Sequence, residues 1–164
     1  MKNIFVLTIM VIVGLFMAGA SYAGTSDTIT LNYEVQAINE INIDDASVTL
    51  TVNTAVAGSQ PTQVSQATTY DITTNCSTNA KKLTAAINTA MPEGLTLSLN
   101  VVAPSGGSSA GTTTITNVAA DVVTGIDAVA ESDIAMTFYL DATAAAGVIG
   151  AASKTLTLTL VDAS

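Results

Sequence analysis

The chain lacks histidine, which most catalytic constellations require. It has no histidine and no tryptophan, all four of its basic residues are lysines, and it has one cysteine. Without histidine there is no Ser-His-Asp or Cys-His arrangement and no zinc site of the usual kind. A Ser-Lys pair built on Lys81, Lys82 or Lys154 stays open, although these lysines flank predicted strands. We therefore predict that the protein is not an enzyme and has no catalytic, cofactor-binding or metal-binding residues and no cofactor.

The shortage of positive charge restricts the partners, and the single cysteine restricts covalent cross-links. Thirteen carboxylates against four lysines give a net charge of -9 at pH 7. Because binding to nucleic acid or anionic membranes requires positive charge, we expect neither as a partner. Cys76 rules out an intrachain disulfide. We interpret it as a small, half-buried residue at a strand end, with an intermolecular bridge as the alternative.

The first 23 residues have the pattern of a cleaved signal peptide. Lys2 precedes an almost wholly apolar run at residues 4–17, and small residues follow up to Ala23. We predict cleavage after Ala23, with Ala20 as second choice. The run is too short and wrongly flanked to remain as a membrane span, and no later segment is apolar enough. The mature chain is therefore expected to be secreted to the extracellular space or cell surface, without a membrane span and with a net charge of −10.

The rest of the chain alternates apolar and polar residues in short segments. These segments cover residues 29–37 (continuing toward 43), 48–52, 69–74, 83–87, 95–102, 112–118, 134–141 and 155–161. Turn-forming residues separate them, and no stretch keeps a helical repeat over three turns. The pattern predicts an all-β protein, an immunoglobulin-like antiparallel β-sandwich of about 7–9 strands, with residues 38–164 as one domain. Residues 118–130 and 142–152 are ambiguous.

The inward faces of these strands predict the core. It comprises Val48, Leu50, Val52, Tyr70, Ile72, Leu83, Ala85, Ile87, Leu95, Leu97, Leu99, Val101, Ile134, Met136, Phe138, Leu140, Leu156, Leu158 and Leu160. Four carboxylates that lie close in sequence, at Asp121, Asp127, Glu131 and Asp133, suggest calcium ligands. Their spacing matches no known calcium loop, so an ordinary solvated loop is the preferred interpretation.

At the start of the mature chain, apolar and polar residues alternate without interruption over residues 28–37. We call residues 25–37 the N-terminal segment. Its inward positions are Ile29, Leu31, Tyr33, Val35 and Ala37, and polar residues occupy the positions between them. Such a strand, over residues 24–37, is suited to burial on one side. It meets either its own sandwich or a neighbouring copy of the protein, and the alternation does not distinguish the two.

Four short motifs stand in an order that resembles a known family. They are Ile29-Thr-Leu-Asn-Tyr-Glu-Val35 with the isoleucine-rich residues 38–43, Thr74-Asn75, Lys81-Lys82-Leu83, and Leu156-Thr-Leu-Thr-Leu160. This order is similar to that in the major subunits of colonisation-factor-type fimbriae, which an alternate chaperone–usher route assembles. The resemblance implies a sandwich that lacks one strand, filled by the N-terminal strand of the next subunit in donor-strand exchange. It also implies a homopolymer, a periplasmic chaperone and an outer-membrane assembly pore as partners.

The expected function is therefore that of a structural subunit of a secreted surface filament, a pilus or fimbria. The candidate donor-strand residues are Ile29, Leu31, Tyr33, Val35 and Ala37, and the candidate groove residues are Leu156, Leu158 and Leu160. One alternative is a monomeric secreted adhesion or carbohydrate-binding module, which should expose a cluster of aromatic side chains. Another is a surface-layer or matrix protein.

Overall fold

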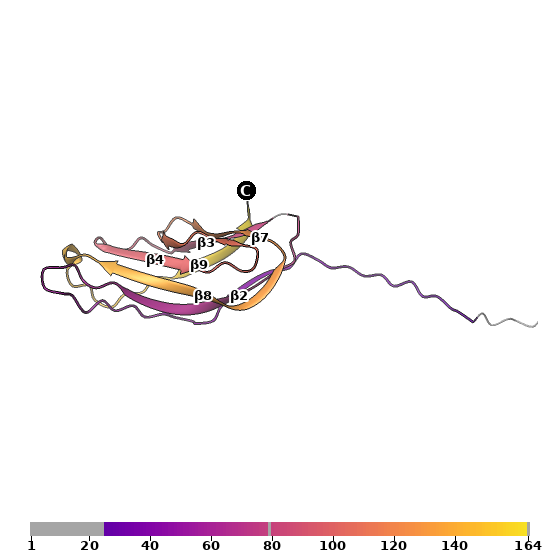
Figure 1. Cartoon of the computed structure of the whole chain (residues 1–164), viewed down its shortest axis with the longest axis horizontal. Coiled ribbons are helices and arrows are strands. Elements are labelled where there is room, and N and C mark those ends of the chain that lie inside the picture. The colour runs from indigo at the N-terminus through magenta and orange to yellow at the C-terminus, as the bar shows by residue number, and fades with distance from the viewer. Residues whose placement is uncertain (1–24, 79, 164) are drawn as a thin grey trace, which may run out of the picture. The chain divides into compact units, whose positions relative to one another are not determined.

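A computed structural model describes residues 25–78 and 80–163, and the strands in them form two antiparallel sheets that pack as a β-sandwich. One sheet has the strand order β1-β2-β8-β4-β6 and the other β5-β7-β3-β9. Figure 1 shows β2 and β8 in one layer and β3 and β7 in the other. The strands are β1 (Asn39–Ile43), β2 (Val64–Thr74), β3 (Lys81–Ile87), β4 (Leu95–Val101), β5 (Ser108–Ser109), β6 (Thr112–Thr114), β7 (Ala120–Ile126), β8 (Val129–Ala142) and β9 (Leu156–Asp162). The predicted all-β sandwich is confirmed.

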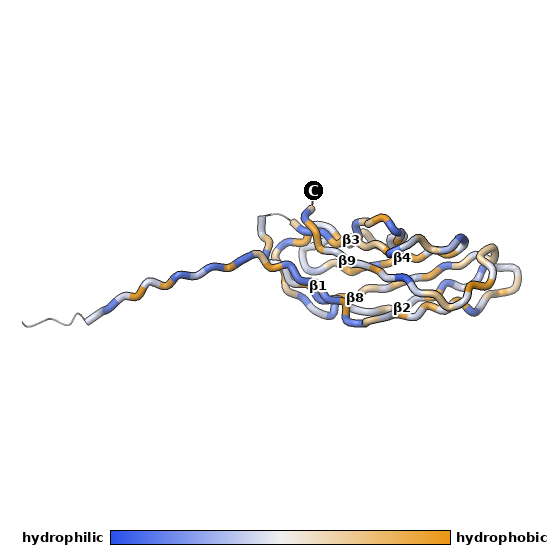
Figure 2. Tube along the Cα trace, turned by 180° about the vertical axis from the view of Figure 1, so that it is seen from behind, coloured by the Kyte–Doolittle hydropathy of each residue, from blue (hydrophilic) through white to orange (hydrophobic). Residues whose placement is uncertain are grey.

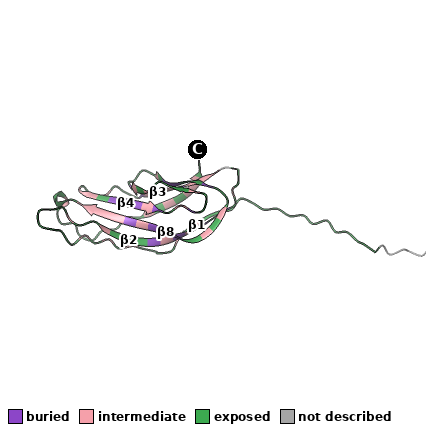
Figure 3. Ribbon diagram, in the orientation of Figure 1, coloured by how far each residue is buried: buried purple, intermediate pink, exposed green. Residues whose placement is uncertain are grey.

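The core lies between the two sheets and follows the alternation of the sequence. Along β2, for example, Thr68, Tyr70, Ile72 and Thr74 are buried, and the residues between them are half-buried or exposed. Buried positions also recur along β4 and β8 in Figure 3. The buried apolar residues are Tyr70, Ile72, Leu83, Ala85, Ile87, Leu97, Leu99, Val101, Ile115, Val122, Val123, Ile126, Ile134, Met136 and Phe138. Of the other predicted core residues, Leu95, Leu140 and the leucines of β9 are half-buried.

Several predicted boundaries are wrong, and the ambiguous stretches are resolved. Residues 112–118 form only the short strand β6, residues 118–130 contain β7, and residues 142–152 contain a 3-10 turn at Ala144–Ala146. In β7, Val122 and Val123 are both buried although they are neighbours. The β3–β7 register shifts between Leu83 and Thr84, and such an irregularity breaks the strict alternation of faces. A strand with this pattern cannot be recognised by a period of two.

Residues 48–52 have the burial of a strand without being one. They were predicted as a strand, and Val48, Leu50 and Val52 are indeed half-buried with exposed residues between them. No ladder joins them to another strand, so the prediction of a paired strand is wrong. The side chains follow the predicted face, while the backbone lacks a strand to pair with.

Most of the N-terminal segment is described apart from the sandwich, because residues 25–34 belong to a different unit from the residues that follow them. The predicted strand over residues 28–37 is not formed, since residues 26–38 carry no strand assignment. Its large apolar side chains are exposed, at 93% for Ile29, 80% for Leu31, 88% for Tyr33 and 78% for Val35. Figure 2 shows the alternation of hydropathy along this segment. A single strand has no ladder partner and cannot bury a face by itself.

The signal peptide and the membrane spans were the two sequence predictions that concern targeting. The predicted signal peptide, residues 1–23, lies outside the described residues. Over the described part of the chain, no helix reaches the length and hydropathy that a bilayer crossing demands.

Candidate functional site

One side of the sandwich is bounded by two strand edges that lack a partner. Strand β1 pairs with β2 and β9 pairs with β3, and each is the last strand of its sheet. The two edges come from opposite sheets and approach each other on this side. Residues 47–54, which follow β1, have no strand partner within the described chain. Unpaired backbone N–H and C=O groups along such edges can accept another strand.

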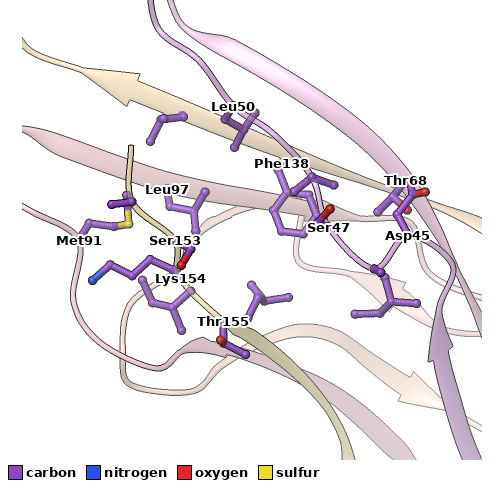
Figure 4. A pocket seen from close by; sticks show the side chains of 17 residues that line it. Asp45, Ser47, Leu50, Thr68, Met91, Leu97, Phe138, Ser153, Lys154 and Thr155 are labelled. Atoms are coloured by element: carbon purple, nitrogen blue, oxygen red, sulfur yellow. The ribbon is translucent and has the colours of Figure 1, made fainter. Parts of the chain in front are cut away.

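An apolar groove of about 430 Å³ opens on this side of the sandwich. Residues 43–50 line one wall and residues 152–156 line the other. Core side chains are reached from it, because Ile87, Leu97 and Phe138 are also among its lining residues. Figure 4 shows Leu97 and Phe138 between the two walls. These three core side chains are buried, and half-buried residues such as Val48, Leu50 and Leu156 supply the accessible apolar surface of the groove.

The predicted groove residues of β9 lie partly in this opening. Leu156 lines it, whereas Leu158 and Leu160 do not. All three are half-buried and pack against the core from the same face of β9. The sequence did not reveal that Val48 and Leu50, which were predicted as core residues, line the opposite wall. Their alternation resembles that of a core strand, because both situations bury one face.

The polar groups along the groove differ in how they are satisfied. Asp45, Ser47 and Thr155 are exposed, so water can reach them. Lys154 is half-buried, and its Nζ donates a hydrogen bond to Thr89 Oγ1 at 2.6 Å. Thr68 is only 7% exposed, and its Oγ1 is buried without a hydrogen-bond partner among the described residues. Thr68 Oγ1 is therefore a lining side-chain oxygen that is neither accessible to solvent nor paired with a described residue.

A polar clamp holds the chain immediately before β1. The Asn75 side chain accepts a hydrogen bond from the Ile38 N–H at 2.8 Å and donates one to the Gln36 carbonyl oxygen at 2.7 Å. The Asn75 N–H also donates to the Ile38 carbonyl oxygen at 3.2 Å. We call these three hydrogen bonds the Asn75 clamp. In the sequence Asn75 stood out only as part of the Thr74-Asn75 motif, because a contact across 37 residues leaves no local pattern.

Cys76 follows the clamp at the end of β2 and is half-buried. Its Sγ lies 3.5 Å from Asn39 Oδ1. This is the position that was expected for a small residue at a strand end. The structure contains one copy of the chain and so does not test an intermolecular bridge.

The acidic residues that suggested calcium are engaged separately. Asp121 forms an ion pair with Lys82 at 3.1 Å, and Glu131 accepts a hydrogen bond from the Ser105 N–H at 3.0 Å. Asp133 Oδ2 accepts a hydrogen bond from the Ser132 hydroxyl at 3.4 Å. No three potential metal ligands come together among residues 25–78 and 80–163. The calcium interpretation therefore receives no support from the geometry.

Two titratable groups of the sandwich are shifted from their ordinary values. Burial, and secondarily the charge of Glu131, raises the pKa of Tyr70, whose hydroxyl donates to the Val102 carbonyl oxygen at 2.7 Å. The hydrogen bond to Asp162 raises the pKa of Lys81. Lys81 lies on β3 and Asp162 on β9, so this pair ties the end of β9 to the sheet.

No relative supplies information about the site. Neither a protein-family model nor a curated protein matches the sequence. The aromatic cluster expected of a carbohydrate-binding module is not formed by the tyrosines of the sandwich, because Tyr70 is buried and Tyr139 is half-buried. The apolar groove and the exposed N-terminal segment are the two features on which a functional interpretation can rest.

Proposed function

We propose that this protein is a structural subunit of a secreted surface filament and that it polymerises by strand addition. The N-terminal segment of one copy adds to the free edge of β9 in the next copy and places its apolar face in the groove. One observation carries the proposal: the same chain has an exposed apolar face on its N-terminal segment and an apolar groove beside the unpaired edges of β1 and β9. Addition of an extended segment to a sheet edge is a recurring mode of recognition.

The exposed apolar surface is large enough to stabilise such an assembly. Four side chains of the segment, Ile29, Leu31, Tyr33 and Val35, are each at least 78% exposed. Fully burying an aliphatic side chain of this size contributes roughly 1.5–3 kcal/mol before the entropy of ordering the segment is subtracted. Backbone hydrogen bonds to β9 add to this. A filament joined in this way should dissociate slowly.

The base of the segment favours a second copy over the segment's own sandwich. Folding back would require a tight reversal between residue 35 and β1. The residues there are Gln36, Ala37 and Ile38, none of which favours the turn conformations that tight hairpins need. In addition, the Asn75 clamp occupies the Gln36 carbonyl and both backbone groups of Ile38.

The groove is shorter than the segment, so assembly requires a rearrangement. Only Leu156 of the β9 leucines lines the groove, and β1 lies close to β9. Seating all four side chains requires β1 to move away from Leu158 and Leu160. A chaperone and an outer-membrane assembly pore, which the family resemblance implies, would hold the subunit before this step.

Polymer formation by paired variants tests the proposal. We define the inward variant as Leu31→Asn with Val35→Asn, and the outward variant as Thr30→Asn with Glu34→Gln. The mature wild-type chain should form polymers that survive detergent and separate on heating. The outward variant should do the same, because its changes lie on the opposite face of the strand. The inward variant should stay monomeric with an unchanged circular dichroism spectrum.

Polymer formation should be measured over a range of protein concentrations, because a weak assembly could be missed at low concentration. A wild-type chain that stays monomeric at high concentration contradicts the proposal and favours a monomeric module. An inward variant that polymerises as the wild type does also contradicts it, because the polymer would then not depend on the apolar face.

A further inference from the structure

Thr68 occupies a place in the groove where the chain leaves a polar atom unsatisfied. It lies on the inward face of β2, in line with the buried residues Tyr70, Ile72 and Thr74. Figure 4 shows it beside Asp45 at one end of the groove. Its Oγ1 is buried and has no hydrogen-bond partner among the described residues. A buried hydroxyl without a partner costs free energy, so such groups are normally paired.

The equivalent hydroxyl further along β2 is paired within the sandwich. Thr74 is 2% exposed, and its Oγ1 donates a hydrogen bond to Asn39 Oδ1 at 2.9 Å. The two threonines share a strand, a face and a residue type, and they differ in whether β1 supplies a partner. The missing partner of Thr68 therefore coincides with the side of the sandwich where the groove opens.

The N-terminal segment has one inward side chain that can pair with a hydroxyl. Ile29, Leu31 and Val35 are wholly apolar, whereas Tyr33 has a phenolic O–H that can both donate and accept. Tyr33 is 88% exposed in the single chain. When a tyrosine becomes buried, its hydroxyl usually finds a hydrogen-bond partner. The segment and the groove thus each have one polar group that burial would leave unsatisfied.

We propose that, once the movement of β1 that assembly requires has uncovered Thr68 Oγ1, Tyr33 of the incoming copy forms a hydrogen bond with it and thereby sets the register of the added strand. This inference rests on the proposed function and specifies how the partner is recognised. A shift by one residue would turn the apolar face outward. A shift by two residues would place Leu31 or Val35 at Thr68, leaving the threonine hydroxyl and the Tyr33 hydroxyl both without this bond. Only one register satisfies both hydroxyls and keeps the apolar face in the groove.

The first test compares the free subunit with the polymer. In the full-length inward variant, which supplies the monomer, Thr68→Val should leave the urea midpoint unchanged or raise it, because it removes an unpaired buried hydroxyl without changing side-chain size. The matched control Thr74→Val should lower the midpoint, because Thr74 is paired with Asn39. In the chain that polymerises, Thr68→Val should instead speed dissociation in detergent. A loss of stability in the free subunit as large as that of Thr74→Val would overturn the inference.

The second test is a double-mutant cycle on the dissociation rate of the polymer. Tyr33→Phe and Thr68→Val should each increase the rate roughly 2- to 12-fold, which corresponds to the net contribution of one hydrogen bond. The double variant should dissociate no faster than the faster single variant. Rates that multiply, or single variants that match the wild type, overturn the pairing of Tyr33 with Thr68 while leaving strand addition intact. A wild-type chain that forms no polymer contradicts the proposed function itself and the pairing with it.

Discussion

The Asn75 clamp gives a prediction that does not depend on polymerisation. Asn75→Ala removes the two side-chain hydrogen bonds, to the Ile38 N–H and to the Gln36 carbonyl oxygen, and leaves the backbone bond between Asn75 and Ile38. A hydrogen bond contributes about 0.5–1.5 kcal/mol net, and the lower part of this range applies because these groups are exposed and water can replace their partners. The expected loss in the free energy of unfolding is therefore about 1–2 kcal/mol.

Urea unfolding and amide exchange measure this loss globally and locally. With a slope of about 2 kcal/mol/M, the urea midpoint of Asn75→Ala in the inward variant should fall by roughly 0.5–1 M. Exchange at the Ile38 amide should become much faster, because its hydrogen bond goes to the Asn75 side chain. Asn75→Asp is the matched control, since its carboxylate still accepts from the Ile38 N–H but cannot donate to the Gln36 carbonyl oxygen.

Asn75→Asp and Asn75→Ala should differ in the protection of the Ile38 amide, and this difference reports on the clamp. In Asn75→Asp the Ile38 amide should stay protected while part of the stability is lost. If Asn75→Ala leaves both the urea midpoint and the Ile38 exchange rate unchanged, the clamp does not hold the chain in solution. The argument for a second copy at the groove would then lose one of its two supports, and only the lack of turn-forming residues at positions 36–38 would remain.

Two further predictions concern the sandwich itself. Because burial raises the pKa of Tyr70 above its unfolded value of about 10, the contribution of Tyr70 to the free energy of unfolding should be constant below pH 10 and fall above it, by up to about 1.4 kcal/mol per pH unit. Tyr70→Phe should therefore reduce the alkaline loss of stability in urea titrations between pH 9 and 11. An equal slope in Tyr70→Phe would assign the alkaline loss to other groups. Gly94→Ala should cost about 2–4 kcal/mol, because Gly94 has φ +79 and an added Cβ would lie 2.8 Å from Ala146 Cβ. Gly58→Ala is its control, with φ +86 and no atom within 4 Å, so similar urea midpoints for both would contradict the steric argument.

The sequence predicted strands best where alternation and pairing coincide. Lys81–Ile87 and Leu95–Val101 were recognised to within two residues, because each has one buried face and two paired edges. Ala120–Ile126 was not assigned, because its register shift buries two consecutive valines. Residues 48–52 were assigned as a strand although no ladder joins them to another strand. Alternation reports which side chains are buried, and it does not report whether a neighbouring strand is present.

Only part of the candidate site could be predicted from the sequence. The apolar face of the N-terminal segment and the role of β9 as an apolar strand could be inferred from the sequence, and Leu156 does line the groove. The opposite wall at Val48 and Leu50 could not, because these residues have the pattern of an ordinary core strand. The unpaired hydroxyl of Thr68 was also missed, since a threonine on a predicted strand gives no sign of whether its partner exists.

The amino-acid sequence by itself determined the class of the protein. The short alternating segments lead to a β-sandwich, because this fold class depends on a period of two along the chain. The tertiary structure decided which edges remain unpaired, where the groove opens, that Asn75 clamps the chain before β1, and that Thr68 lacks a partner. These features depend on contacts between residues tens of positions apart, and such contacts exist only once the two sheets have packed together.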